Sequence, residues 1–122
     1  MSDFLVGIDL GTSNCAVAYV DAARGLDAPV LDFPIVQTVR HADVGPLPLL
    51  PSAIYLSHPN EFPESYSSHI VGEFARWQGA RVPLRLITSA KSWLSHSGVD
   101  RTAAILPWGA PSDVEKMSPV EA

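Results

Sequence analysis

Apolar residues near the N-terminus form two short runs separated by a polar turn. Residues 4–9 form an apolar run that ends at Asp9, which predicts a strand buried on both faces. Residues 11–14 have the composition of a turn, and residues 15–20 follow as a second run of small and β-branched side chains. Strands joined by so short a turn are expected to pair as a hairpin.

The middle of the chain alternates strand-like segments with loops. Residues 30–39 predict one or two strand pieces on either side of Pro34, and residues 52–56 predict a further strand. The prolines and the glycine within residues 41–51 predict a loop, and a second loop is expected for residues 58–68.

Helical patterns are confined to two short segments. Residues 73–81 predict a helix with Phe74 and Trp77 on one face, and Pro83 interrupts that pattern. A second short helix is predicted for residues 89–94.

Toward the C-terminus, residues 103–106 predict a short strand, and the final residues have the sequence of a helix start. Ser118 fits an N-cap, Pro119 fits the first helical position, and Glu121 fits the residue that reaches back to the cap. Because a single helical turn is not stable by itself, we expect residues 1–122 to be the N-terminal part of a longer domain, truncated at the start of a helix.

Composition narrows the class of protein. Hydrophobic residues make up 47% and charged residues 17% of the chain, which argues against a disordered segment. The formal charge of -5 disfavours a general nucleic-acid surface. Cys15 is the single cysteine, so an internal disulfide is excluded and a reducing compartment fits. The first residues do not have the pattern of a signal peptide or a membrane anchor, and we therefore expect a cytoplasmic protein.

The strongest chemical signal is the turn after the first strand. Backbone N–H groups in such a turn can bind phosphate oxygens, and Gly11 lets the backbone approach a ligand closely. Thr12 and Ser13 add hydroxyl donors. Asp9 beside a polyphosphate needs a cation between them, and Mg²⁺ meets proteins through one or two carboxylates. An ordinary hairpin with local side-chain turns at Asp9 and Asn14 accounts for the same residues.

Residues 7–14, Gly-Ile-Asp-Leu-Gly-Thr-Ser-Asn, resemble the first phosphate motif of the actin-like ATPase superfamily. That superfamily includes DnaK-type heat-shock chaperones, actin-like filament proteins and sugar kinases. The motif by itself does not choose among these classes.

Later segments resemble the DnaK-type heat-shock chaperones in particular. Residues 50–56 are similar to the family's Thr-Pro-Ser-Val-Val-Ala-Phe strand, with Leu50 in place of the Thr. Residues 71–76 are similar to its Val-Gly-x-x-Ala-Lys segment, and residues 89–94 resemble its Ala-Lys-Arg-Leu-Ile-Gly helix. Residues 118–121 resemble its Thr-Pro-Glu-Glu helix start. These segments keep the family's order over nearly the whole chain. The Trp93 position and residues 105–111 look more like a divergent bacterial branch than the standard chaperone.

The resemblance implies site residues for ATP or ADP and Mg²⁺. Lys91 matches the lysine that reaches the γ-phosphate and the attacking water, so Lys91 and Asp9 are the candidate catalytic residues. Asp9 would meet Mg²⁺ through water, and the phosphates would contact Gly11, Thr12, Ser13 and Asn14. On a helical wheel, Lys91 lies at the edge of an apolar face made by Ile87, Ala90, Trp93 and Leu94. A surface lysine that only extends its stem along that face is the alternative.

The resemblance also implies an α/β fold: a partial actin-like (ribonuclease H-like) ATPase domain. It would hold the first strands of one lobe and a small inserted α+β subdomain over roughly residues 41–111. In intact relatives, ATP hydrolysis drives the binding and release of unfolded peptides, with cochaperones as further partners. No nucleic-acid or membrane partner is expected.

Two alternatives share the first turn. A sugar or small-metabolite kinase would need a sugar-binding Asp downstream and has no reason to carry the Ala-Lys-x-x-Leu helix. An actin-like filament subunit would be non-enzymatic. For residues 1–122 alone we expect no significant ATPase activity and weak nucleotide binding, together with an exposed apolar edge over residues 4–20 that is prone to association.

Overall fold

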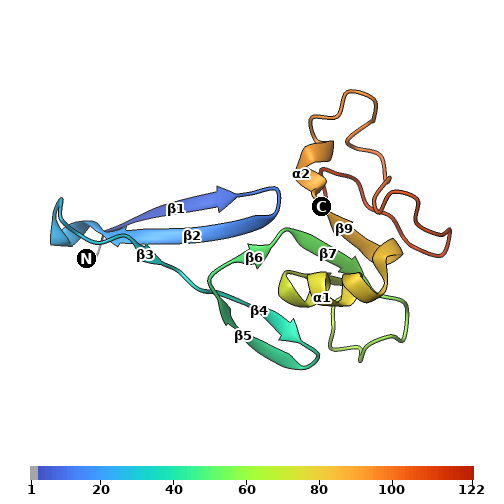
Figure 1. Cartoon of the computed structure of the whole chain (residues 1–122), viewed down its shortest axis with the longest axis horizontal. Coiled ribbons are helices and arrows are strands. Elements are labelled where there is room, and N and C mark those ends of the chain that lie inside the picture. The colour runs from blue at the N-terminus through green and yellow to red at the C-terminus, as the bar shows by residue number, and fades with distance from the viewer. Residues whose placement is uncertain (1–2) are drawn as a thin grey trace.

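The computed structural model describes residues 3–122 and shows a mixed α/β chain with small antiparallel sheets and few helices (Figure 1). A long hairpin extends to one side of the molecule. Strand β3 (Leu31–Asp32) runs along this hairpin, and the other strands and the two short helices lie toward the other side. Every strand pairing within the described residues is antiparallel.

The predicted N-terminal hairpin is confirmed. Strand β1 (Phe4–Leu10) pairs with β2 (Asn14–Asp21), from Phe4 opposite Asp21 to Leu10 opposite Cys15. A 3-10 turn, η1 (Ala22–Arg24), follows the hairpin, and β3 (Leu31–Asp32) and β6 (Leu50–Pro51) both pair with β2. As a result, β2 lies inside this sheet and β1 lies at its edge.

The expected burial of the first strand on both faces is wrong for the described chain. Phe4, Leu5 and Ile8 are 52%, 68% and 65% exposed, and every residue of β1 is exposed. Within residues 3–122, the only strand that pairs with β1 is β2. An apolar run indicates that a strand is suited to burial, but burial also requires another element that covers the strand.

The loop expected over residues 41–51 is in part a strand. Strand β4 (Ile35–Arg40) forms a hairpin with β5 (Asp43–Leu47), and Ala42 in the connection has a positive φ of 60°. Pro46 lies in β5 opposite Val36. A proline is tolerated there because a two-stranded sheet consists of edge strands only. The two pieces expected around Pro34 are β3 and β4.

The body of the molecule is a three-stranded sheet covered by a helix. Strand β7 (Ala53–Leu56) lies between β8 (His69–Val71) and β9 (Leu86–Thr88). Helix α1 (Glu73–Arg81) has the predicted bounds, and a 3-10 turn at η2 (Pro83–Arg85) follows it. Helix α2 (Ala90–Trp93) lies within the segment expected to be helical. Strands β8 and β9 were not predicted, because three residues are too few to show a period of two.

Two apolar clusters form the core, one on each face of β7. Tyr55 and Phe74 are the largest fully buried side chains, and they lie in a cluster with Ala53, Ile70 and Ala75. The second cluster consists of Leu56, Ile87, Leu106 and Val114. Ile87 belongs to β9 and not to the helix that carries Lys91, because its backbone pairs with Ile54 of β7. The helical wheel that placed Ile87 on the apolar face of the Lys91 helix is therefore wrong for Ile87.

The C-terminal segment bears out the capping box but not the expected strand. The Ser118 N–H donates to the Glu121 carboxylate at 2.8 Å, and the Glu121 N–H donates to Ser118 Oγ at 3.2 Å. The strand expected over residues 103–106 is reduced to one bridge between Leu106 and Met117. No helix in the described part of the chain is long and apolar enough to cross a membrane.

Candidate phosphate-binding site

The connection between β1 and β2 is tight and depends on glycine. Leu10 still pairs with Cys15, and β2 begins at Asn14, so residues 11–13 make the whole connection. A Cβ at Gly11 would overlap the carbonyl oxygen of Asn14. Only glycine therefore fits here without a shift of the backbone.

Ser52 holds this turn from the opposite side. Its N–H donates to the Ser13 carbonyl at 2.9 Å, and its hydroxyl donates to the Gly11 carbonyl at 2.7 Å. The pairing of Asn14 with Pro51 continues the contact along β6. The Gly11 and Ser13 carbonyls are thus engaged. The N–H groups of Thr12 and Ser13 donate to no acceptor among residues 3–122. This arrangement leaves backbone donors for an anion.

Lys91 reaches the same turn from a distant part of the sequence. Its Nζ donates to the Leu10 carbonyl at 2.7 Å, across a separation of 81 residues. Ser89, directly before α2, has a left-handed φ of 55° and turns the chain from β9 into the helix. An ammonium group has three donors, so this single hydrogen bond leaves capacity for a ligand oxygen.

A cavity of about 440 Å³ lies beside Lys91 and the start of the turn. Gly11, Cys15 and Ser52 line its polar part, and Lys91 is its only charged side chain. Most of the remaining lining is apolar, from β6, β7, β9 and α2 and from the C-terminal residues Pro119, Val120 and Ala122. The Sγ of Cys15 lies 3.6 Å from the Ser52 hydroxyl, so the cysteine packs against the residue that holds the turn.

The structure does not bring Asp9 into contact with Lys91. Asp9 is exposed, it pairs through its backbone with Ala16, and its carboxylate makes no hydrogen bond or ion pair among the described residues. No group of three or more His, Cys, Asp or Glu side chains that could hold a metal comes together in residues 3–122. A single carboxylate is still sufficient for Mg²⁺ that keeps most of its water. Thr12 and Ser13 are exposed, and Asn14 is half-buried.

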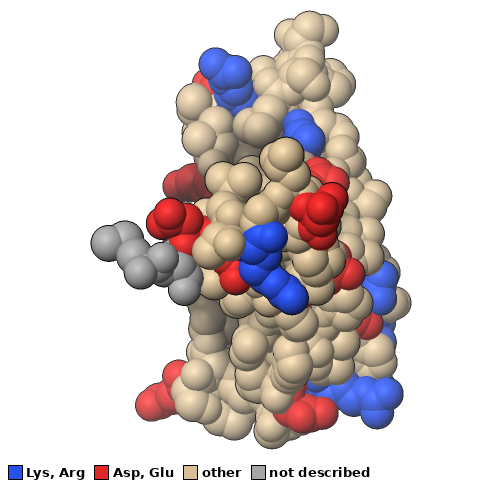
Figure 2. Space-filling model, turned by 90° about the vertical axis from the view of Figure 1, so that its left-hand side faces the viewer, with Lys and Arg blue, Asp and Glu red and all other residues tan. Residues whose placement is uncertain are grey.

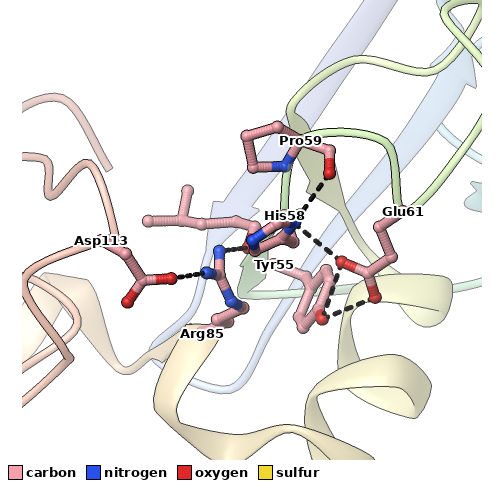
Figure 3. Close-up of polar contacts among 7 residues, drawn as sticks. Tyr55, His58, Pro59, Glu61, Arg85 and Asp113 are labelled. Carbon is pink, nitrogen blue, oxygen red and sulfur yellow. Dashed lines mark hydrogen bonds and ion pairs between the residues drawn. The ribbon is translucent and has the colours of Figure 1, made fainter.

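A second polar cluster surrounds Glu61 (Figure 3). The Glu61 carboxylate accepts hydrogen bonds from the Tyr55 hydroxyl and the His58 N–H, each at 2.8 Å, and from the Gln78 amide at 2.9 Å. Burial opposes ionisation of Glu61, but these hydrogen bonds outweigh it and hold the pKa of this carboxyl below its usual value. Burial, with the hydrogen bond to Glu61, raises the pKa of Tyr55 to about 12.

Arg85 completes this cluster. It donates to the Leu56 carbonyl at 3.2 Å and pairs with Asp113 at 2.6 Å (Figure 3). A cavity of about 400 Å³ lies alongside, lined in part by His58, Phe62 and Arg85. The donors and acceptors of the cluster are already paired with one another. Their effect is to fix residues 57–68 onto the body, and we assign the cluster a structural role.

The charged side chains do not gather into a patch on the face in Figure 2, which is the left-hand side of Figure 1. Basic and acidic residues are interspersed there, and most of that face is uncharged. Comparison of the chain with models of protein families, with curated proteins and with solved structures finds no match. Site assignment therefore depends on the geometry of the turn.

Ser52 is the residue of this site that the sequence did not identify. It lies in the segment 50–56 that resembles the chaperone strand, between β6 and β7, but a serine there carries no signal for a contact with a turn 41 residues earlier. The sequence did identify the turn and Lys91, and the structure brings these two together.

Proposed function

We propose that the turn between β1 and β2, together with Lys91, binds the phosphates of Mg-ATP or Mg-ADP. In this proposal the chain is the N-terminal part of a partial actin-like ATPase domain of the DnaK chaperone type. The observation that supports it best is the hydrogen bond of 2.7 Å from Lys91 Nζ to the Leu10 carbonyl. The turn and Lys91, which the family resemblance implies as parts of one phosphate site, are in contact through that bond.

Each residue has a defined part in this proposal. The Thr12 and Ser13 N–H groups and hydroxyls donate to phosphate oxygens, and Ser52 keeps the turn in place. The Lys91 ammonium offsets negative charge that develops on the transferred phosphoryl group. Asp9 would hold Mg²⁺ through water, and the ion supplies the positive charge that lets a carboxylate lie close to phosphate.

Full activity needs more groups than this chain offers. Phosphoryl transfer depends on several positioned donors and cations around the phosphates, and here one turn, one lysine and one carboxylate are candidates. We therefore expect weak nucleotide binding and no measurable ATP turnover from residues 1–122. In a complete protein of this type, ATP hydrolysis would drive unfolded-peptide binding and release, assisted by cochaperones. The Lys91 helix favours this class over a sugar kinase or a filament subunit.

The test is a titration of the ¹⁵N-labelled chain with Mg-ATP, followed by amide chemical shifts. We expect the largest shifts at Gly11, Thr12, Ser13 and Asn14, and Lys91→Ala should weaken the affinity by about 5- to 10-fold, or roughly 1 kcal/mol. Arg76→Ala is the matched control. It also removes one positive charge, but Arg76 lies on α1 and pairs with Glu73 at 2.7 Å.

Asp9→Asn separates the metal from the phosphate contribution. The wild-type chain should lose affinity when Mg²⁺ is replaced by EDTA, while the Asp9→Asn chain should bind ATP equally in both conditions. The proposal is wrong if the shifts lie away from the turn, or if Lys91→Ala and Arg76→Ala have equal effects.

A further inference from the structure

The segment of residues 50–56, which comprises β6, Ser52 and β7, pairs with two different neighbours in succession. β2 pairs with β6, and the Ser52 N–H continues that pairing by donating to the Ser13 carbonyl at 2.9 Å. From Ala53 onward the neighbour is β9, whose last residue, Thr88, lies opposite Ala53. The phosphate turn and the end of β9 therefore reach adjacent residues of the same segment.

The directions of the hydrogen bonds indicate that these two neighbours lie along the same edge. The Ala53 carbonyl accepts from the Gly72 N–H at 3.1 Å, so the backbone groups of Ala53 are directed toward β8. These directions alternate along a strand, so the groups of Ser52 and Ile54 are directed to the opposite edge, which is the edge of β9. The contact of Lys91, on α2, with the end of the hairpin agrees with this arrangement (Figure 1).

Ser89 is the residue at which the chain leaves this edge. In the register of β7 and β9, the residue after Thr88 would lie opposite Ser52, but the Ser52 N–H is bonded to Ser13 of the turn. Ser89 instead adopts a left-handed conformation, with φ 55° and ψ 29°, and α2 begins at the next residue. This conformation is unfavourable for residues other than glycine, and here one residue makes the whole connection.

The backbone of Ser89, and not its side chain, sets the path of the chain toward Lys91. The Ser89 side chain makes no capping hydrogen bond to α2. Ala90, the residue between them, packs against the second apolar cluster, so the start of the helix is held in place. With both residues fixed, Lys91 leaves the helix toward the turn, and its Nζ lies 2.7 Å from the Leu10 carbonyl oxygen.

We propose that Ser89 is a positioning residue of the candidate phosphate site. Its left-handed backbone ends β9 where the turn occupies the edge, and it directs Lys91 to the Leu10 carbonyl. An unfavourable backbone conformation that is kept beside a candidate site has this kind of role. The effect of Ser89 on nucleotide binding rests on the function proposed above, whereas its effect on Lys91 does not.

The first test is the ¹³C chemical shift of the Leu10 carbonyl in the full chain without nucleotide. Lys91→Ala gives the value for a carbonyl that has lost this hydrogen bond. Ser89→Val should move the shift most of the way to that value, because a β-branched residue strongly disfavours a positive φ. Ser89→Gly should keep the wild-type shift, because glycine adopts a positive φ readily.

Ala42→Val is the matched control. Ala42 also has a positive φ, of 60°, but it lies between β4 and β5 and away from the turn. This variant should leave the Leu10 shift unchanged. If Ser89→Val does not fold by circular dichroism, Ser89→Thr, which keeps the hydroxyl and adds one methyl group, should move the shift in the same direction. An unchanged shift in the folded variant, an equal change in Ala42→Val or Ser89→Gly, or failure of both β-branched variants to fold would each overturn the proposal.

The second test is the Mg-ATP titration. Ser89→Val should weaken the affinity by about 5- to 10-fold, as Lys91→Ala does, and the double variant should bind about as well as Lys91→Ala alone. Multiplied losses in the double variant would show that Ser89 acts independently of Lys91, which would contradict the proposal. If the wild-type chain does not bind Mg-ATP, the proposed function fails, and the Leu10 shift still decides the role of Ser89.

Discussion

Strands β1 and β7 have similarly apolar sequences, but they lie in opposite environments. Every residue of β1 is exposed, whereas Ala53, Tyr55 and Leu56 of β7 are buried. The difference is in the neighbours. β7 has a strand on each edge and an apolar cluster on each face, and β1 has a strand on one edge. The comparison shows that an apolar strand becomes core only where distant segments of the chain cover it.

The two regions should therefore respond differently to loss of apolar side chains. Phe74→Ala, in the cluster that covers β7, should destabilise the fold by about 3–5 kcal/mol, because Phe74 is fully buried. Ile8→Ala in β1 should cost less than about 1 kcal/mol, because the side chain stays in water. Urea unfolding followed by far-UV circular dichroism measures both. Similar losses in the two variants would mean that the hairpin is covered in solution.

A second comparison is between two glycines of the hairpin. Gly11→Ala should destabilise the chain by about 1–3 kcal/mol and remove Mg-ATP binding, because the added methyl group displaces the Asn14 carbonyl and opens the turn. Gly7→Ala should leave nucleotide binding unchanged, since its Cβ has room. Thermal unfolding and the ATP titration check the pair. Retained binding in Gly11→Ala would remove the turn from the site.

The stability that Glu61 contributes to the body of the molecule should depend on pH. Its folded-state pKa lies below the ordinary value of 4.5, so the stability it contributes is fully present above pH 4.5 and is lost as the pH falls through the folded-state pKa. Glu61→Gln should cost about 1–2 kcal/mol at pH 7, reduced by partial solvent screening, and progressively less as the pH falls below 4.5. Urea unfolding at pH 7 and at a series of lower pH values measures this difference.

Asp100→Asn is the control for that titration. The pKa of Asp100 is also lowered, by hydrogen bonds from Thr102, but this carboxylate is fully exposed and lies outside the cluster. A loss of stability in Glu61→Gln that does not change with pH would show that the packing of residues 57–68, and not the charge of Glu61, is responsible for it.

Among the substitutions expected to perturb the candidate site, Ser52→Ala should have the smallest effect. Ser52→Ala removes the hydroxyl that donates to the Gly11 carbonyl and should cost about 0.5–1.5 kcal/mol. It should also weaken Mg-ATP binding a few-fold, because the turn is less fixed. Ser57→Ala is a suitable control, since that hydroxyl also donates to a carbonyl, that of Ser68, but away from the turn. Equal binding by both variants would show that Ser52 does not position the site.

Local sequence was sufficient where an element is specified by its own residues. The hairpin followed from two apolar runs around a short polar turn, helix α1 was predicted with its observed bounds, and the capping box of Ser118 and Glu121 forms as expected. In each case the hydrogen bonds join residues near one another in the chain. Strands β5, β8 and β9 were missed, because they are short and exist only by pairing with β4 and β7.

The candidate site, too, was predicted from the sequence only in part. The sequence by itself determined the glycine turn, its possible donors and the helix that carries Lys91, because these depend on backbone conformations and residue types within a few positions. Only the tertiary structure decided that Lys91 reaches Leu10, that Ser52 holds the turn, that Asp9 stays apart from Lys91, and that β1 is exposed. These outcomes depend on contacts across 41 to 81 residues and on which segments cover a strand, and no local pattern encodes either.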